Sequence, residues 1–403
     1  MLKKISLAVF LVAVLGMFSA TFGIGAQSGE PIKIGALFDL TGPTSGVGHP
    51  WSVGLNAYVD WINSQGGVAG RPLELFSGDT VYRVDDARVL YEQFVHDNNV
   101  VAVLGWGTAD TEALKAEIAA DEIPFMSASY SANLADIDEA PYNFLLSATY
   151  SDQMIIVMQW ALDDWAAKGN EGVPNIAIIH HDSSFGTSTF DAFGPDGNEF
   201  AEARGINLTT IPMPGGATDF TPQLAVAQGA GADYIVVQNV STPAITLAQN
   251  AAGLGIDAQL ICLNWCSDEL FVEGAGDAAE GVVGVFPFAP ASSTVPGMEE
   301  VRAYFAEQGQ DIEELSLHAP QAWWSMSIMV EGIRRVIEAG NDVTGANIRA
   351  ALENSDPITT GDVTPSLSFS PTDHRGTRSV QLYQVVNGEW VAITELLNAE
   401  EIF

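Results

Sequence analysis

The chain repeats one local pattern from residue 32 onward: a short apolar run, a polar turn, and then an amphipathic stretch of helical period. The first apolar runs predict strands at Ile32–Phe38, Pro72–Ser77, Val100–Leu104 and Ile123–Ser127. The stretches between them predict helices near Trp51–Ser64, Val84–Asn98 and Thr111–Asp121. Such alternation is typical of a parallel sheet with helices on both faces.

A second series of the same kind begins after a helix predicted at Ser151–Lys168, with Ser151 and Asp152 in N-cap positions. Its strands are expected at Asn175–Ile179, Ile206–Ile211, Asp233–Gln238 and Gln259–Cys262. Its helices are expected near Thr187–Arg204, Phe220–Gln228 and Thr242–Gly253. Four later segments are expected to complete these lobes: Gly281–Phe286, His318–Ala339, Ser379–Val386 and Trp390–Thr394. The expected fold class is therefore α/β, with two doubly wound lobes.

The first 26 residues read as a secretory signal peptide. Lys3 and Lys4 precede an apolar run from Ile5 to Phe18, and small residues follow up to Ala26. No later run of about 18 apolar residues appears, so the exported chain is not expected to be embedded in a membrane. No Cys follows the apolar run, so we expect no lipid anchor and a freely diffusing protein.

Composition narrows the class of partner. Acidic residues outnumber basic ones 51 to 15, which gives a formal net charge of −36. Such a surface repels nucleic acid, so nucleic acid is excluded as a partner. With 47% hydrophobic and 16% charged residues, the chain is expected to be globular with large cores.

The loops that follow the strands are the expected ligand site, because open α/β sheets bind ligands beyond the carboxyl ends of their strands. Two facing lobes would make a cleft. Its candidate loops are Asp39–Gly48, Asp79–Arg83, Gly105–Asp110, Ala128–Ser131, His181–Gly186, Asn239–Thr242 and Leu263–Ser267. The first of them is rich in Gly, Pro, Ser and Thr and precedes a helix, so it suits an anion or a polar group.

Two glycines and a Thr hydroxyl follow the third strand in Gly105–Asp110. Backbone N–H groups and the hydroxyl of Thr108 could therefore meet one ligand oxygen, beside Trp106. The alternative is that Thr108 or Asp110 caps the next helix and that Trp106 belongs to the core. Tyr82, near the end of the second strand, adds another aromatic ring.

Two hydroxyls and an aromatic ring follow the fourth strand, in Ser129, Tyr130 and Ser131. Short loops of this composition bind ligands often. The alternative is a serine-rich turn with Tyr130 on the surface. If the cleft assignment is correct, Thr108→Ala and Tyr130→Ala should weaken binding with little effect on folding.

The second lobe offers Phe185, Asn239, Asn264 and Trp265 at or near its strand ends. Phe185 and Trp265 could close on a ligand from that side. Alternatively, Phe185 is a staple at a helix start and Trp265 packs over Cys262.

Neither catalytic nor metal chemistry is predicted, and no cofactor is expected. His180 and His181 are neighbours on a strand, so their rings point in opposite directions and do not readily share an ion. Gly274–Ala279 mimics a dinucleotide-binding motif but lacks the preceding buried strand. Cys262 and Cys266 could form a disulfide in an exported protein or remain free thiols.

Taken in order, these motifs resemble the leucine/isoleucine/valine-binding protein family of periplasmic solute-binding proteins. The resemblance runs through IKIGALFDLTGPTSGVG, INSQGGVAGRPLEL, VVAVLGWGTADTEAL, IPFMSASYSANL, HHDSSFG, GDAAEGVVG and LSFSPTDHRG with VVNGEWV. It implies two Rossmann-like lobes joined by three crossovers, the type I periplasmic-binding-protein fold. On this basis lobe 1 spans residues 31–151 and about 288–375, and lobe 2 spans 152–287 and about 376–403.

The resemblance also implies where a ligand sits. A ligand carboxylate would meet the hydroxyls and N–H groups of Thr108–Ala109 and Tyr130–Ser131, and Phe185 would stack on the ligand. Amino-acid binders of the family supply a carboxylate to the ligand ammonium from a loop that here carries Asn264. This departure favours a more aromatic or apolar carboxylate or amide, unless Asp152 or Asp182 takes that role.

The expected function is therefore capture of a small solute in an interlobe cleft by hinge closure, with delivery to the permease subunits of an ABC importer. The ligand is expected to be an amino acid or another small carboxylate or amide, and the protein a periplasmic monomer without catalytic activity. The alternatives are a ligand-sensing receptor module and a secreted enzyme.

Overall fold

The first apolar run forms strand β1, Ile32–Phe38, with the bounds that the sequence predicts. We describe residues 29–190 and 196–402 of a computed structural model, so the predicted signal peptide lies outside the described residues. β1 pairs in parallel with β2 (Leu73–Asp79) and β3 (Ala102–Gly105), and β4 (Phe125–Ser127) lies beyond β3. The order β2-β1-β3-β4 makes the sheet of the first lobe.

The helices that follow the first three of these strands pack on the sheet. They are α1 (Ser45–Ser64), α2 (Val84–Glu92), which continues as a π-helical turn over Gln93–Asn98, and α3 (Thr108–Asp121). α1 begins six residues before the predicted start and includes Pro50, so the prediction of a loop over Asp39–Gly48 was wrong from Ser45 onward. Burial of Val47 and Trp51 against the lobe explains why the glycine- and proline-rich stretch is helical.

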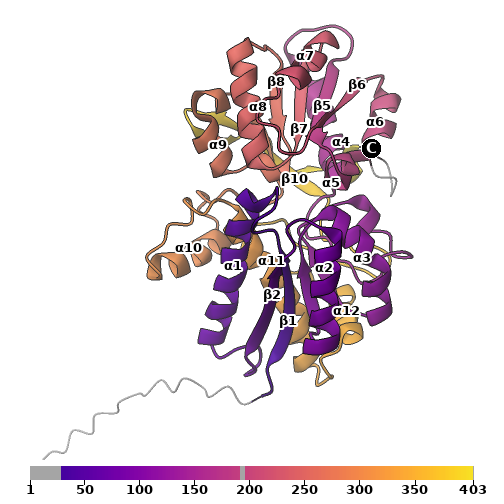
Figure 1. Cartoon of the computed structure of the whole chain (residues 1–403), viewed down its shortest axis with the longest axis vertical. Coiled ribbons are helices and arrows are strands. Elements are labelled where there is room, and N and C mark those ends of the chain that lie inside the picture. Colours follow the sequence, from indigo (N-terminus) through magenta and orange to yellow (C-terminus); the bar gives the residue numbers. More distant parts are fainter. Residues whose placement is uncertain (1–28, 191–195, 403) are drawn as a thin grey trace, which may run out of the picture.

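The second series forms a larger sheet in the other lobe (Figure 1). Its parallel strands are β5 (Asn175–His181), β6 (Asn207–Met213), β7 (Tyr234–Gln238), β8 (Gln259–Cys262) and β9 (Val283–Phe286), in the order β6-β5-β7-β8-β9. The helices of this part are α4 (Tyr150–Ala167), α5 (Ser184–Thr187), α6 (Gly197–Arg204), α7 (Thr221–Gly229), α8 (Ser241–Leu254) and α9 (Glu269–Ala275).

Two helix predictions in this lobe need correction. Thr149, not Ser151 or Asp152, is the N-cap of α4, and the Asp152 carboxylate accepts a hydrogen bond from the backbone N–H of Thr149 in a capping box. The single helix predicted over Thr187–Arg204 is replaced by α5, a 3₁₀ turn and α6. The Asp196 side chain caps α6, which sets its late start.

After β9 the chain returns to the first lobe and then leaves it again. The returning part contains α10 (Pro296–Glu307), α11 (His318–Glu338) and α12 (Gly345–Glu353), and α11 packs along α1. Then β10 (Ser379–Val386) joins the second sheet antiparallel to β9, followed by β11 (Glu389–Ala392), β12 (Leu397–Asn398) and α13 (Ala399–Ile402).

The chain thus passes between the lobes after β4, after β9 and before β10, which confirms two lobes joined by three crossovers (Figure 1). The lobe boundaries near residues 151, 288 and 375 stay predictions. No helix within residues 29–190 and 196–402 is long and apolar enough to cross a membrane.

Candidate functional site

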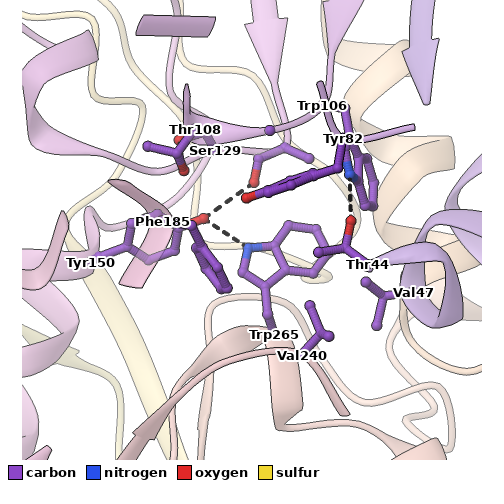
Figure 2. A pocket seen from close by; sticks show the side chains of 12 residues that line it. Thr44, Val47, Tyr82, Trp106, Thr108, Ser129, Tyr150, Phe185, Val240 and Trp265 are labelled. Carbon is purple, nitrogen blue, oxygen red and sulfur yellow. Dashed lines mark hydrogen bonds between the residues drawn. The ribbon is translucent and has the colours of Figure 1, made fainter. Parts of the chain in front are cut away.

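A small cavity lies between the two lobes, at the carboxyl ends of strands from both sheets (Figure 2). Its lining residues are Thr44, Val47, Tyr82, Trp106, Gly107, Thr108, Ala128, Ser129, Tyr150, Phe185, Val240 and Trp265. The cavity volume is ≈ 20 Å³, which holds about one water molecule. The lobes therefore already meet closely around this space.

Two hydroxyls and a helix start form the wall from the first lobe. Thr108 is the first residue of α3, Gly107 is its N-cap, and the hydroxyl oxygens of Thr108 and Ser129 lie 2.7 Å apart. The first N–H groups of a helix have no acceptor inside the helix, so those at Thr108 and Ala109 add donors. Thr108 does not act as the cap, and its side chain lines the cavity.

Trp106 is held in the cavity wall by a short chain of hydrogen bonds. The buried carboxylate of Asp39 accepts from the backbone N–H of Gly42 at 2.6 Å and from the hydroxyl of Thr44 at 2.6 Å. Trp106 Nε1 in turn donates to the Thr44 hydroxyl at 2.9 Å, as drawn in Figure 2. The turn after β1 therefore fixes an aromatic wall.

Trp265 reaches the cavity from the second lobe, beside Phe185 and Val240 (Figure 2). Its ring lies 5.7 Å from that of Trp106 between centroids, and its Nε1 donates to the hydroxyl of Tyr150 at 2.9 Å. Aromatic rings from both lobes thus enclose the space, and hydroxyl groups provide hydrogen-bonding groups on its wall.

No lining residue among those described carries a formal charge. The nearest titratable wall groups are the hydroxyls of Tyr82 and Tyr150, and burial raises the pKa of both, so both remain protonated donors at neutral pH. Asp110 lies on the first turn of α3, and burial raises the pKa of its carboxyl to about 7. The wall therefore suits a neutral or anionic solute better than a cation.

Six of the predicted site residues line this cavity: Tyr82, Trp106, Thr108, Ser129, Phe185 and Trp265. Five do not: Ala109, Tyr130, Ser131, Asn239 and Asn264. Whether any of the eleven binds a ligand stays a prediction.

Those that lie outside the cavity wall have other surroundings. The Ser131 hydroxyl donates to Glu112 at 2.7 Å, and the Asn239 amide faces the sulfur of Met213. Asn264 is buried, and neither polar atom of its side chain has a hydrogen-bond partner among the described residues. These side chains follow strand ends but do not line the cavity.

Tyr130 is fully buried, so the alternative of a surface tyrosine was wrong. Its hydroxyl accepts a hydrogen bond from Gln321 at 2.8 Å, and its ring stacks on Trp265. Truncating such a ring leaves a cavity that costs about 3–5 kcal/mol of stability. The expectation that Tyr130→Ala spares folding therefore does not fit its surroundings.

Sequence reasoning missed six lining residues, namely Thr44, Val47, Gly107, Ala128, Tyr150 and Val240. All but Tyr150 lie in loops that were predicted to line the cleft. Their place in those loops was the only indication in the sequence that they could line the cavity. Tyr150 is the first residue of α4, behind the capping box. The sequence could have indicated Tyr150 through its place at a helix start directly after a crossover between the lobes.

The two carboxylates considered as substitutes for a ligand partner do not reach the cavity wall. Asp152 is buried and pairs with Arg378 at 2.6 Å, and Asp182 is exposed. Cys262 and Cys266 are both buried free thiols, so the pair is not bridged by a disulfide.

His181 lies near the cleft on β5. Its Nδ1 is 2.7 Å from the Ser183 hydroxyl, and burial lowers the pKa of this imidazole.

Known proteins share this architecture. A family model described as periplasmic binding protein matches residues 31–389. Among curated proteins, Leu/Ile/Val-binding protein homolog 7 of Brucella abortus (strain 2308) is 25% identical over 352 residues, which covers 81% of each chain.

Solved structures agree on the fold. The crystal structure of a branched chain amino acid ABC transporter from Thermus thermophilus with bound valine has a TM-score of 0.84 at 23% identity, covering 92% of this chain and 97% of that chain. A fatty acid ABC transporter substrate-binding protein from Thermomonospora curvata has a TM-score of 0.81 at 21% identity, covering 93% and 94%. The chain belongs to the periplasmic binding protein family, and curated proteins that resemble it are named as Leu/Ile/Val-binding protein homologs, the type that the sequence motifs predict.

Proposed function

We propose that this chain is the extracytoplasmic binding component of an ABC importer, which captures a small carboxylate or amide between its lobes and delivers it to the permease subunits. Membership of the periplasmic binding protein family and the predicted N-terminal signal peptide support this role. The protein acts as a periplasmic monomer and without catalysis.

The composition of the cavity wall carries the proposal. The hydroxyls of Thr108 and Ser129 and the start of α3 can donate to a carboxylate or amide oxygen, and aromatic rings enclose an apolar remainder. Among the described residues, no carboxylate lines the wall to pair with an ammonium group. An acid or amide without an α-amino group is therefore the preferred ligand, because a buried unpaired ammonium is costly.

Binding requires the lobes to move. A cavity of ≈ 20 Å³ is far smaller than any organic acid, so a solute enters only when the walls separate. The three crossovers allow the lobes to rotate as units. Closure then brings Trp265 and Phe185 onto the solute from the second lobe.

Thermal denaturation with matched ligand pairs tests the proposal. The pairs are valine with 3-methylbutanoate and phenylalanine with 3-phenylpropanoate, together with the amide of each acid. A ligand at 100 times its dissociation constant should add about 2.7 kcal/mol to the free energy of unfolding. We expect an acid or amide to stabilise the protein more than its amino-acid counterpart. Stabilisation by amino acids alone would contradict the proposed ligand class.

A substitution that removes one hydroxyl tests the site. Its effect is measured as the affinity for whichever compound stabilises the protein. Thr108→Val removes the hydroxyl at nearly constant volume and should raise the dissociation constant about tenfold or more. Thr246→Val is the control, because the Thr246 hydroxyl donates to the Thr242 carbonyl within α8 and does not line the cavity. Equal affinities in both variants would exclude Thr108 from the site.

A further inference from the structure

A buried contact between the lobes lies behind Trp265. His318 Nε2 is 2.7 Å from Asp268 Oδ2, and both side chains are 0% exposed. Asp268 is the N-cap of α9 in the second lobe, whereas His318 is the first residue of α11, which packs along α1 in the first lobe. This pair therefore joins two bodies that the proposed function requires to separate.

Asp268 is anchored within the second lobe, where it also accepts a hydrogen bond from the hydroxyl of Ser241 at the start of α8. The next residue, Glu269, reaches across as well. Its carboxylate accepts from the backbone N–H of Ala291 at 2.8 Å and of Leu317 at 2.7 Å, both in the segment that returns to the first lobe. Two consecutive acidic side chains of the second lobe, Asp268 and Glu269, thus contact the first lobe or the segment that returns to it.

His318 is anchored within the first lobe and continues the chain of contacts to the cleft loop. Its Nδ1 lies 3.0 Å from Gln321 Oε1, and Gln321 Nε2 donates to the Tyr130 hydroxyl at 2.8 Å. Both ends of this chain stack on the same cavity residue. The Trp265 ring lies 5.1 Å from His318 and 6.1 Å from Tyr130, with interplanar angles of 20° and 13°.

We propose that Asp268 and His318 are positioning residues that latch the lobes together and hold Trp265 in the cavity wall. Separating a fully buried carboxylate from its imidazole partner leaves polar groups without compensation until water reaches them. The pair therefore favours the closed arrangement and, through the stacked His318 ring, the orientation of Trp265. The inference rests on the proposed hinge closure.

Small-angle X-ray scattering of the protein without added solute tests the latch. The variants are His318→Gln and Asp268→Asn, and the asparagine retains an oxygen that can accept from Phe271 N–H as the cap of α9. Each should lower the ratio of closed to open molecules about tenfold or more, seen as a larger radius of gyration. Circular dichroism checks that each variant remains folded.

Two matched controls separate latching from general stability. His374 is also fully buried and contacts a carboxylate, Glu353, at 2.9 Å, but its other partner is the Asn143 carbonyl, so all three lie in the first lobe. His374→Gln should lower the unfolding temperature without changing the radius of gyration. Tyr234→Phe removes a hydrogen bond to the Asp164 carboxylate inside the second lobe and should likewise leave compactness unchanged.

An unchanged radius of gyration in both folded latch variants would overturn the proposal, as would equal expansion in His374→Gln. Because scattering is measured without solute, this result does not depend on the ligand class. If no compound in the thermal panel stabilises the protein, that result counts against the proposed ligand class. It does not affect the interpretation of the scattering experiment, which uses no ligand.

Discussion

Burial sets the chemistry of single side chains around the cleft, and Asp110 shows this most directly. Its side chain is 4% exposed on the first turn of α3, and one carboxyl oxygen, Oδ2, has no hydrogen-bond partner among the described residues. The other oxygen accepts from the Thr111 N–H at 3.0 Å. Desolvation outweighs this bond and raises the pKa of the carboxyl to about 7, above its ordinary value of 3.8.

A pH dependence of stability follows from this shift. Between pH 3.8 and about 7, the folded state keeps a proton that the unfolded state loses. The contribution of Asp110 to stability is therefore full below pH 3.8, falls as the pH rises, and is lost above about 7. From pH 5 to pH 7 the loss is about 2 kcal/mol.

Asp110→Asn, which resembles the protonated acid, should flatten the decline in unfolding free energy between pH 5 and pH 8. Urea denaturation at several pH values measures it. Asp257→Asn, at an exposed position, is the control and should follow the wild-type profile. A variant profile as steep as that of the wild type would show that Asp110 is ionised in the folded protein throughout.

At the level of elements, the contact between α1 and α11 attaches the returning segment to the first lobe. Gly54 makes the close approach possible, because a Cβ at this position would lie 1.9 Å from the backbone carbonyl oxygen of Ala319. α11 carries His318 at its start, so this contact also places the interlobe contact. A helix that is remote in sequence thus depends on one glycine.

Gly54→Ala should lower the free energy of unfolding by about 1–3 kcal/mol, since the clash is with backbone and forces the helices apart. Gly253→Ala is the matched control. No neighbouring atom lies within 4 Å of a Cβ there, so the alanine should stabilise α8 by about 0.5–1 kcal/mol. Chemical denaturation compares the two, and equal effects would refute the packing explanation.

For the whole molecule, the excess of acidic residues is the dominant electrostatic feature. A formal net charge of −36 implies self-repulsion that disfavours the compact state. Closing two acidic lobes adds to this repulsion. The cavity wall itself carries no formal charge among the described residues, so the repulsion acts through the surface.

Salt should therefore stabilise the protein. Raising NaCl from 10 to 150 mM shortens the screening length from about 30 to about 8 Å and should raise the melting temperature by about 2–4 °C. KCl at equal ionic strength should give the same shift if screening is the cause. A melting temperature that stays constant or falls in both salts would contradict this expectation.

The sequence by itself determined the local elements and their order. β1 and β8 have the predicted bounds, and the two α/β series follow as expected, because hydrophobic period and turn residues act over a few neighbouring positions. Errors concentrate at helix starts. α1 runs through Pro50 because burial of Val47 and Trp51 outweighs a local preference. Helices α10 and α12 were not anticipated.

The predicted strand ends also indicated where most of the cleft lies, since parallel strands end at one edge of a sheet. Six of eleven predicted side chains line the cavity, and the remainder, such as Asn264 and Ser131, follow the predicted strands without lining it. Side-chain direction in a loop depends on backbone angles that composition does not specify.

Only the tertiary structure decided which distant residues meet. Trp265 meets the Tyr150 hydroxyl across many intervening positions, and Asp268 meets His318 between the lobes. These contacts arise from how the crossovers bring α11 and the second sheet together, which no local pattern encodes. Physically, strands and helices follow from interactions between near neighbours, whereas the closed cleft follows from packing between surfaces that form only after both lobes have folded.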